Sequence, residues 1–429
     1  MTTVHRTSTP RIIATPELGA ADLPEQVTVA LGELADAAKQ GLLAFSVGVG
    51  LTVVEELFQE ELQRLVGPRG KHDATRTAHR HGEERRQLTL GGRRVTVRKP
   101  RARTTAGQEL PLRTYRAFAS RDLLTQAALE RILAGLSSRR YGAGLEPVGE
   151  LGRRGTSKSA VSRRFIAGTQ RKLAALLARD LSGLDLLAVF LDGLVVADHC
   201  VIVALGVDAE GTKHVLGLWE GATENQAVCG ALLRDLVRRG LAADRTRLYV
   251  IDGGKGLHAA ATAAFGEHAL IQRCRVHKRR NVLDHLPERE RVFVGRALDQ
   301  AWAEPDVARA EAALHALARQ LERTHPGAAA SLREGQAETL TVTRLGLPPS
   351  LLRTFKSTNP IESMNGVCRT VARNVKRWGD GAMVLRWMAA GMSEAERQFR
   401  RINGYRDLHV LKRALERQEE VTGSTKKSA

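Results

Sequence analysis

Two short apolar runs, each followed by an aspartate, constrain this chain more than any other feature of its sequence. Residues 186–191 precede Asp192, and residues 248–251 precede Asp252. Short continuous apolar runs bounded by turn residues indicate strands buried on both faces of a sheet. A carboxylate directly after such a strand is costly in a closed core unless it is paired or binds a metal. For each aspartate alone, an ordinary strand-ending Asp-Gly turn is an equal alternative.

The residues around these runs alternate between strand and helix patterns. Strands are predicted at 186–191, 200–206, 213–219, 247–251 and 269–274, and helices at 224–239, 254–265 and 276–284. A three-strand meander followed by alternating helices and strands is the order of the ribonuclease H-like fold. We therefore predict an α/β core with a mixed five-stranded sheet. Its first and fourth strands lie parallel and side by side, so both aspartates reach the sheet edge where open α/β sheets bind ligands.

A third acid, Glu362, lies in the first turn of a helix predicted to begin near Asn359. Asn359 as N-cap, Pro360 and Glu362 fit a capping box, which explains Glu362 without chemistry. The alternative joins Glu362 to the two aspartates. Three such carboxylates form a site for two Mg²⁺ or Mn²⁺ ions that activates water or a hydroxyl against phosphate. Asn365 and Arg369 follow on the same helix face, where they can hold phosphate or a substrate strand.

The charge of the chain indicates a polyanionic partner. Lys and Arg total 66 against 47 Asp and Glu, a net charge of +19. Phosphate contacts release counterions, so this excess favours DNA over a basic protein with no nucleic-acid partner. Residues 182–270, which hold both aspartates, carry 7 basic and 11 acidic side chains. The predicted centre is thus locally acidic within a basic frame.

Residues 76–103 contain 10 Lys and Arg against 2 Glu. Within them, Gly91-Gly92 joins two alternating strands and predicts a β-hairpin. Its basic residues, Arg93, Arg94, Arg98 and Lys99, are candidate DNA contacts, and a solvated hairpin is an equal alternative. A second candidate is a short helix after an N-cap at Ser157, read as the second helix of a helix-turn-helix. It offers Lys158, Ser162 and Arg163 to DNA, and a capped surface helix is its alternative.

Two further features are open to more than one interpretation. Cys274 and His277 form a CxxH pair, which supplies only two of the four ligands of a structural zinc site. A role in packing, or in polarising the site, is favoured over zinc. Trp302 is interpreted as a core residue, with stacking on an unpaired base as the alternative.

Four motifs together resemble the Mutator-like class of bacterial insertion-sequence transposases, which are DDE enzymes. They lie at 190–193, 250–256, 273–277 and 357–365, and the resemblance extends from the hairpin near Arg80 to about Gly404. Asp192 and Asp252 are 60 residues apart, and Glu362 follows after another 110. The resemblance implies that these three acids are the metal-binding triad and that Cys274 and His277 are the family's CxxH signature. It also implies an all-helical insertion before Glu362.

The activity implied by the resemblance is metal-dependent cleavage and strand transfer at the ends of an insertion sequence. Two Mg²⁺ or Mn²⁺ ions serve each site, and the partners are double-stranded terminal inverted repeats and target DNA. Pairing two DNA ends implies a homodimer or a higher assembly. A ribonuclease H-like nuclease without strand transfer is one alternative. A non-catalytic DNA-binding regulator derived from a transposase is another.

The sequence also predicts an organisation along the chain and a location. The expected parts are a disordered segment (1–20), a helical region (21–75), a DNA-binding region (76–181), the first part of the core (182–286), the helical insertion (287–349), the final part of the core with Glu362 (350–405) and a C-terminal tail (406–429), which is polar and frayed after Leu415. Four scattered cysteines predict a reducing compartment. Without a signal peptide or an apolar span long enough for a bilayer, we expect a cytoplasmic protein.

Overall fold

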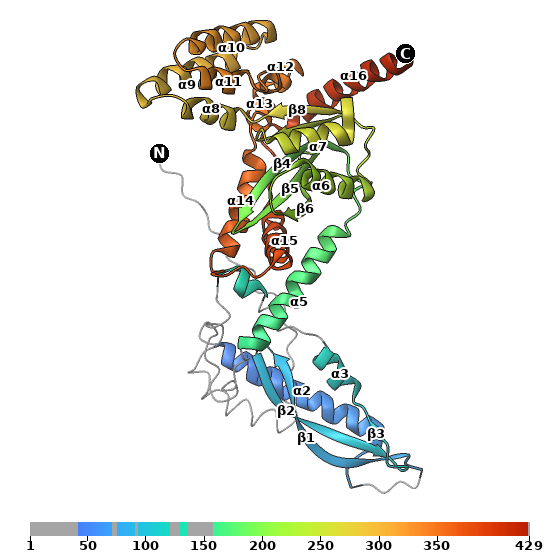
Figure 1. Cartoon of the computed structure of the whole chain (residues 1–429). Coiled ribbons are helices and arrows are strands. Elements are labelled where there is room, and N and C mark those ends of the chain that lie inside the picture. The colour runs from blue at the N-terminus through green and yellow to red at the C-terminus, as the bar shows by residue number, and fades with distance from the viewer. Residues whose placement is uncertain (1–41, 71–74, 91–92, 121–128, 136–157, 428–429) are drawn as a thin grey trace, which may run out of the picture. The chain divides into compact units, whose positions relative to one another are not determined.

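The structure of this chain is a computed structural model (Figure 1). It describes residues 42–70, 75–90, 93–120, 129–135 and 158–427. The predicted disordered segment 1–20 lies outside these residues. The chain divides into two compact units, Met1–Ala128 with Ser138–Ser162, and Leu129–Ser137 with Arg163–Ala429. No helix among the described residues is long and apolar enough to cross a membrane.

The first unit packs one helix on a small antiparallel sheet of order β1-β2-β3. Its elements are α2 (Leu42–Val66), β1 (Ala78–Leu90), β2 (Arg93–Thr104), β3 (Glu109–Leu110) and α3 (Arg113–Ser120). Leu90 pairs with Arg93, so the predicted two-residue hairpin is confirmed. Phe58 of α2 packs on Leu88 and Val97, which form the buried face of the hairpin.

Helix α5 (Lys158–Leu177) is 20 residues long, so the expectation of a short helix is wrong. Apolar residues such as Val161 and Phe165 continue the helical spacing, and both are buried. The Phe165 ring lies 4.6 Å from that of Trp387 in α15 (Gly381–Arg397). Residues 136–157, which precede this helix and would hold the turn of the predicted helix-turn-helix, lie outside the described part of the chain.

The second unit is built on the predicted mixed five-stranded sheet, of order β6-β5-β4-β7-β8. The strands are β4 (Leu186–Val196), β5 (His199–Asp208), β6 (Lys213–Gly221), β7 (Arg247–Ile251) and β8 (Ala269–Arg273). Strands β4, β5 and β6 pair antiparallel, whereas β7 lies parallel to both β4 and β8. The α/β core and its first-to-fourth strand pairing are confirmed.

Helices cover both faces of this sheet (Figure 1). Helices α6 (Gln226–Arg238) and α7 (Lys255–Phe265) bury one face, where Val189 and Leu191 join the main apolar cluster. On the other face, Phe190 stacks on Phe355 of α13 (Pro349–Phe355), at 5.9 Å between ring centroids. Successive residues of β4 therefore point to opposite helix layers.

A helical segment follows the last strand, and its described residues contain no strand. Its helices are α8 (Arg275–Asp284), α9 (Glu288–Ala303), α10 (Val307–Glu322), α11 (Pro326–Arg333) and α12 (Thr341–Arg344), with the 3₁₀ turn η5 (Ala337–Leu340). Trp302 lies in their apolar core and donates from Nε1 to Oγ1 of Thr339 at 3.1 Å. Its interpretation as a core residue is confirmed, and stacking on a base is not supported by this position.

The expectation that the tail is frayed after Leu415 is wrong, because the chain stays helical to Lys427. Helix α16 (Leu408–Lys427) occupies the tail and buries Leu408, Leu411 and Leu415. These residues recur at helical spacing, so they form one apolar stripe. Lys412 of this helix donates to Asp185 at 2.8 Å, next to the start of β4.

Candidate active site

Asp192 and Asp252 occupy equivalent positions on neighbouring parallel strands. The last residue pair between β4 and β7 is Leu191 with Ile251, so each aspartate is the next residue along its strand. Parallel strands lie about 4.8 Å apart, which makes the two carboxylates neighbours. The expectation that Asp192 ends its strand needs correction, because β4 continues to Val196 by pairing with β5. Only the pairing of β4 with β7 stops before Asp192, because its last pair is Leu191 with Ile251.

Asp192 is a buried carboxylate without a cationic partner among the described residues. Its side chain is only 8% exposed, and its Oδ2 accepts a 2.7 Å hydrogen bond from Nδ2 of Asn365. Burial, followed by repulsion from Asp252 and Glu362, raises the pKa of Asp192 to about 7. Asp252 and Glu362, the two other acids predicted from the sequence, thus both lie close enough to Asp192 to repel its charge.

Asp252 is held by the turn that follows β7. Its Oδ1 accepts from the backbone N–H of Gly254 at 2.9 Å, which closes a turn around the intervening Gly253. Gly253 has φ of +111°, a conformation that L side chains rarely adopt. The Asp-Gly-Gly sequence therefore fixes the direction of the Asp252 carboxylate.

Glu362 lies in the first turn of α14 (Asn359–Ala372). The helix is capped at Thr358 rather than Asn359, and no side chain makes a capping hydrogen bond, so the predicted capping box is not formed. The Thr358 hydroxyl instead donates to Oε1 of Glu362. With 39% of its side chain exposed, Glu362 is accessible from solvent. The Glu362 carboxylate therefore does not cap the helix.

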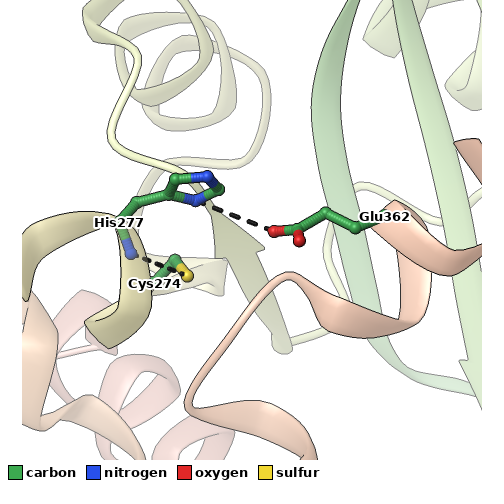
Figure 2. A group of neighbouring side chains, drawn as sticks. All are labelled: Cys274, His277 and Glu362. Atoms are coloured by element: carbon green, nitrogen blue, oxygen red, sulfur yellow. Dashed lines mark hydrogen bonds and ion pairs between the residues drawn. The ribbon is translucent and has the colours of Figure 1, made fainter. Parts of the chain in front are cut away.

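Cys274 and His277 face Glu362 (Figure 2). Cys274 is the N-cap of α8 and accepts from the backbone N–H of His277 at 3.5 Å. Nδ1 of His277 lies 3.8 Å from Oε1 of Glu362. Burial raises the pKa of Cys274, yet hydrogen bonds with His277 and Thr358 bring it below its ordinary value. The hydrogen bond to Cys274 in turn raises the pKa of His277.

These three side chains form a compact donor group. Within the described part of the chain, Cys274, His277 and Glu362 present metal-ligand atoms that all lie within 4.8 Å of one another. Neither aspartate belongs to this group. The CxxH pair therefore adjoins the predicted triad through Glu362, which agrees with a role in polarising the site.

Glu224 is an acidic residue of this region that sequence reasoning missed. It precedes α6, whose N-cap is Asn225, so its position suggested only the beginning of a helix. Burial and repulsion from Asp252 raise the pKa of Glu224. Only the folding of its loop against the turn after β7 brings it here, and no local motif signals that contact.

The candidate DNA contacts differ in how far their side chains are available. Arg98, Lys158 and Arg163 are exposed, and Ser162 is half-buried. Lys99 is already engaged, because its Nζ donates to Glu84 at 2.7 Å and lies 5.1 Å from the centre of the Tyr115 ring. The other two candidates, Arg93 and Arg94, begin β2 beside the turn, and their side chains lie outside the described ones.

A groove of about 780 Å³ follows the side of α14 beyond Glu362. Ser363, the residue after Glu362, lines it from α14 together with Gly366. Arg373 and Arg397 line it beside two acids, Glu130 and Glu394, and Glu394 pairs with Arg397 at 3.3 Å. Arg369, expected on the Glu362 face, is exposed.

Comparisons with known proteins show the family of this chain. Residues 25–402 match the family model described as "Transposase, Mutator family". The chain is 35% identical over 164 residues to the transposase for insertion sequence element IST2 of Acidithiobacillus ferrooxidans, covering 38% of this chain and 54% of that relative. Identity to the transposase for IS6120 of Mycolicibacterium smegmatis is 29% over 310 residues, covering 69% and 94%. For the transposase of ISRM5 from Rhizobium meliloti it is 26% over 368 residues, covering 84% and 90%. The chain thus spans about half the length of the first relative and most of the other two.

Proposed function

The chain belongs to the Mutator family of transposases, and from that premise we propose that it is a metal-dependent DNA transposase of the DDE type. In this proposal Asp192, Asp252 and Glu362 hold two Mg²⁺ or Mn²⁺ ions. The observation that carries it is the placement of Asp192 and Asp252 at matching positions on parallel strands, with Glu362 close enough to repel Asp192. We assign the α/β core to the ribonuclease H-like fold, which the strand order supports.

The residues present fit divalent cations. Carboxylate oxygens are the ligands that Mg²⁺ prefers in proteins. The described side chains form no ion pair with Asp192 or Asp252, although Asp192 is buried. Oδ1 of the fully buried Asn365 also has no hydrogen-bond partner. When bound, the ions supply Lewis-acid polarisation of a phosphate oxygen and lower the pKa of a bound water.

Side chains and backbone of this chain orient the carboxylates. Asn365 fixes Asp192, the Gly254 N–H fixes Asp252 and the Thr358 hydroxyl fixes Glu362. Holding reacting groups in place before the substrate arrives lowers the entropic part of the barrier. Nδ1 of His277 lies 3.8 Å from Oε1 of Glu362, and after the hydrogen bond to Cys274 the charge of Glu362 also raises the pKa of His277.

The proposed substrates are the ends of an insertion sequence and a target DNA. Hydrolysis of one phosphodiester at each end frees a 3′-hydroxyl. That hydroxyl then attacks a target phosphodiester in line, so a new phosphodiester forms as the target's 3′-oxygen leaves. The groove beside α14, with Arg373 and Arg397, is a path for one strand near the site. Acting on two ends together requires a homodimer or a larger assembly on DNA.

The test is excision and joining from a plasmid that carries this gene between its native flanks. We expect products that depend on Mg²⁺ and that Glu362→Gln abolishes, while binding to the flanks is unchanged. Cut ends without joined products indicate a nuclease. Flank binding without any cleavage, in wild type and variant alike, indicates a DNA-binding regulator. Equal activity of both proteins excludes Glu362 from the reaction.

A further inference from the structure

A side chain added at either of two glycines beside the aspartates would meet the carboxylate of Glu224. Gly193 follows Asp192, and Gly254 is the second residue after Asp252. A Cβ on either glycine would lie closer than 3.0 Å to a carboxylate oxygen of Glu224, a separation that real Cβ atoms essentially never show. The Glu224 carboxylate therefore occupies the space that both glycines leave open.

Backbone conformation does not explain these two glycines. Gly254 has φ of −59° and ψ of 125°, which any L residue adopts. Gly193 lies inside β4 and is not among the glycines of positive φ. This differs from Gly253, whose φ of +111° requires glycine. What Gly193 and Gly254 share is their contact with Glu224.

Glu224 reaches the aspartates from the side opposite α14. Residues alternate along β4, so Gly193 shares the face of Leu191, which α6 and α7 cover. Asp192 lies on the opposite face, where Phe190 meets α13 and Asp192 itself contacts Asn365 of α14. A Cβ built at Gly254 would lie next to the Glu224 carboxylate and also 3.4 Å from Oδ1 of Asp252. The carboxylates of Glu224 and Asp252 therefore both border Gly254. Glu224 and Glu362 thus flank the pair of aspartates on opposite sides.

The charge of Glu224 is not neutralised by the described residues, which give it no hydrogen bond and no ion pair. Glu220, four residues earlier, shows the contrast, because it pairs with Nδ1 of His199 at 2.6 Å. Two adjacent carboxylates repel each other unless a cation or a proton lies between them. Asn365 gives an independent sign of a missing ligand, since this fully buried side chain contacts Asp192 and leaves Oδ1 unpartnered.

We infer that Glu224 is a fourth carboxylate of the divalent-metal site and shares with Asp252 the cation on the side of α6. This inference rests on the proposed function. Gly193 and Gly254 are then glycine because the Glu224 carboxylate must pass between them. The site is held by carboxylates from both helix layers, rather than by the three acids of the sequence motif alone.

The experiment is a titration of the full-length protein with Mn²⁺, with free Mn²⁺ followed by electron paramagnetic resonance. Wild type is compared with Glu224→Gln, with Asp252→Asn and with the control Glu220→Gln. We expect Glu224→Gln to weaken Mn²⁺ binding about tenfold, the effect of losing roughly 1.4 kcal/mol. Asp252→Asn weakens it at least as much, and Glu220→Gln leaves it unchanged.

The outcomes separate this inference from the proposed function. If Glu224→Gln binds Mn²⁺ like wild type while Asp252→Asn loses it, the role of Glu224 is wrong and the proposed metal site stands. If wild type binds no Mn²⁺, both are overturned. If Glu220→Gln weakens binding as much as Glu224→Gln, the effect is a general one of charge, and the inference fails.

A second comparison tests the contact itself. Gly254→Ala is introduced into wild type and into Glu224→Ala, and the thermal midpoint and Mn²⁺ affinity are measured for each. We expect the alanine to lower both quantities in wild type and to have little effect once Glu224 is truncated, because the clash is then gone. An equal loss in both backgrounds would show that Glu224 is not what excludes a side chain at position 254.

Discussion

Asp192 and Asp235 lie in the same α/β unit, at 8% and 6% exposure, but differ in what surrounds their charge. Asp235 of α6 accepts from Nε of Arg239 at 2.8 Å and also pairs with Arg238. Asp192 accepts from the neutral amide of Asn365 and faces two other acids. A carboxylate neutralised inside the chain belongs to the scaffold. One left among other carboxylates is available to a cation from solution, so the comparison supports the proposed metal site.

The largest expected effect is on catalysis, where the acids without partners are essential. Asp252→Asn removes a metal ligand, so we expect DNA strand cleavage to fall about a thousandfold or more. Asp244→Asn is the matched control, because Asp244 is exposed and close in sequence. Cleavage rates measured on a plasmid substrate check this. A cleavage rate for Asp252→Asn within tenfold of the wild-type rate would contradict the proposed role of Asp252.

The paired acid is expected to matter for stability instead. Arg239→Met leaves Asp235 buried without its main partner and frees the carbonyls of Leu176 and Leu216, which Arg239 also binds. Breaking such a buried pair costs about 3–5 kcal/mol. Urea unfolding measures the loss. A decrease in the free energy of unfolding below about 1 kcal/mol would show that the Asp235–Arg239 pair does not stabilise the fold.

Neutralising Asp192 is expected to increase folding stability, whereas removing the partner of Asp235 decreases it. Its pKa is raised from 3.8 to about 7 on folding, so the folded state binds the proton more tightly. Stability is therefore lost as pH rises from about 4 to 7, at about 1.4 kcal/mol per pH unit. Asp192→Asn avoids this loss, and in EDTA we expect its advantage to grow from near zero at pH 4 to about 4 kcal/mol at pH 8. A difference independent of pH would contradict the assigned repulsion.

The smallest expected effect is on DNA binding and concerns two basic residues of the hairpin, one without and one with an ion-pair partner among the described residues. Arg98 is exposed, whereas Lys99 is paired with Glu84. Arg98→Gln is expected to reduce the salt dependence of DNA binding by about one phosphate contact. Lys99→Gln should leave that dependence unchanged and cost at most about 1 kcal/mol of stability. Filter binding over a range of NaCl concentrations distinguishes them, and identical slopes for both variants would refute the distinction.

The sheet could be predicted because its determinants are local. Apolar runs define β4 and β7, and their pairing follows from the order of elements, so Asp192 and Asp252 were found together. Glu224 was missed because its role depends on a loop packed against Gly193 and Gly254, residues distant in sequence. Glu362 looked like a capping residue, since Asn359 and Pro360 allow a box that the helix does not form.

The measurement that tests the central claim most directly is a crystal structure of the full-length protein grown with Mn²⁺, using the anomalous signal of manganese. The account predicts anomalous peaks in contact with Asp192, Asp252 and Glu362. A structure with no peak at these carboxylates, or with manganese bound only by Cys274 and His277, would contradict it.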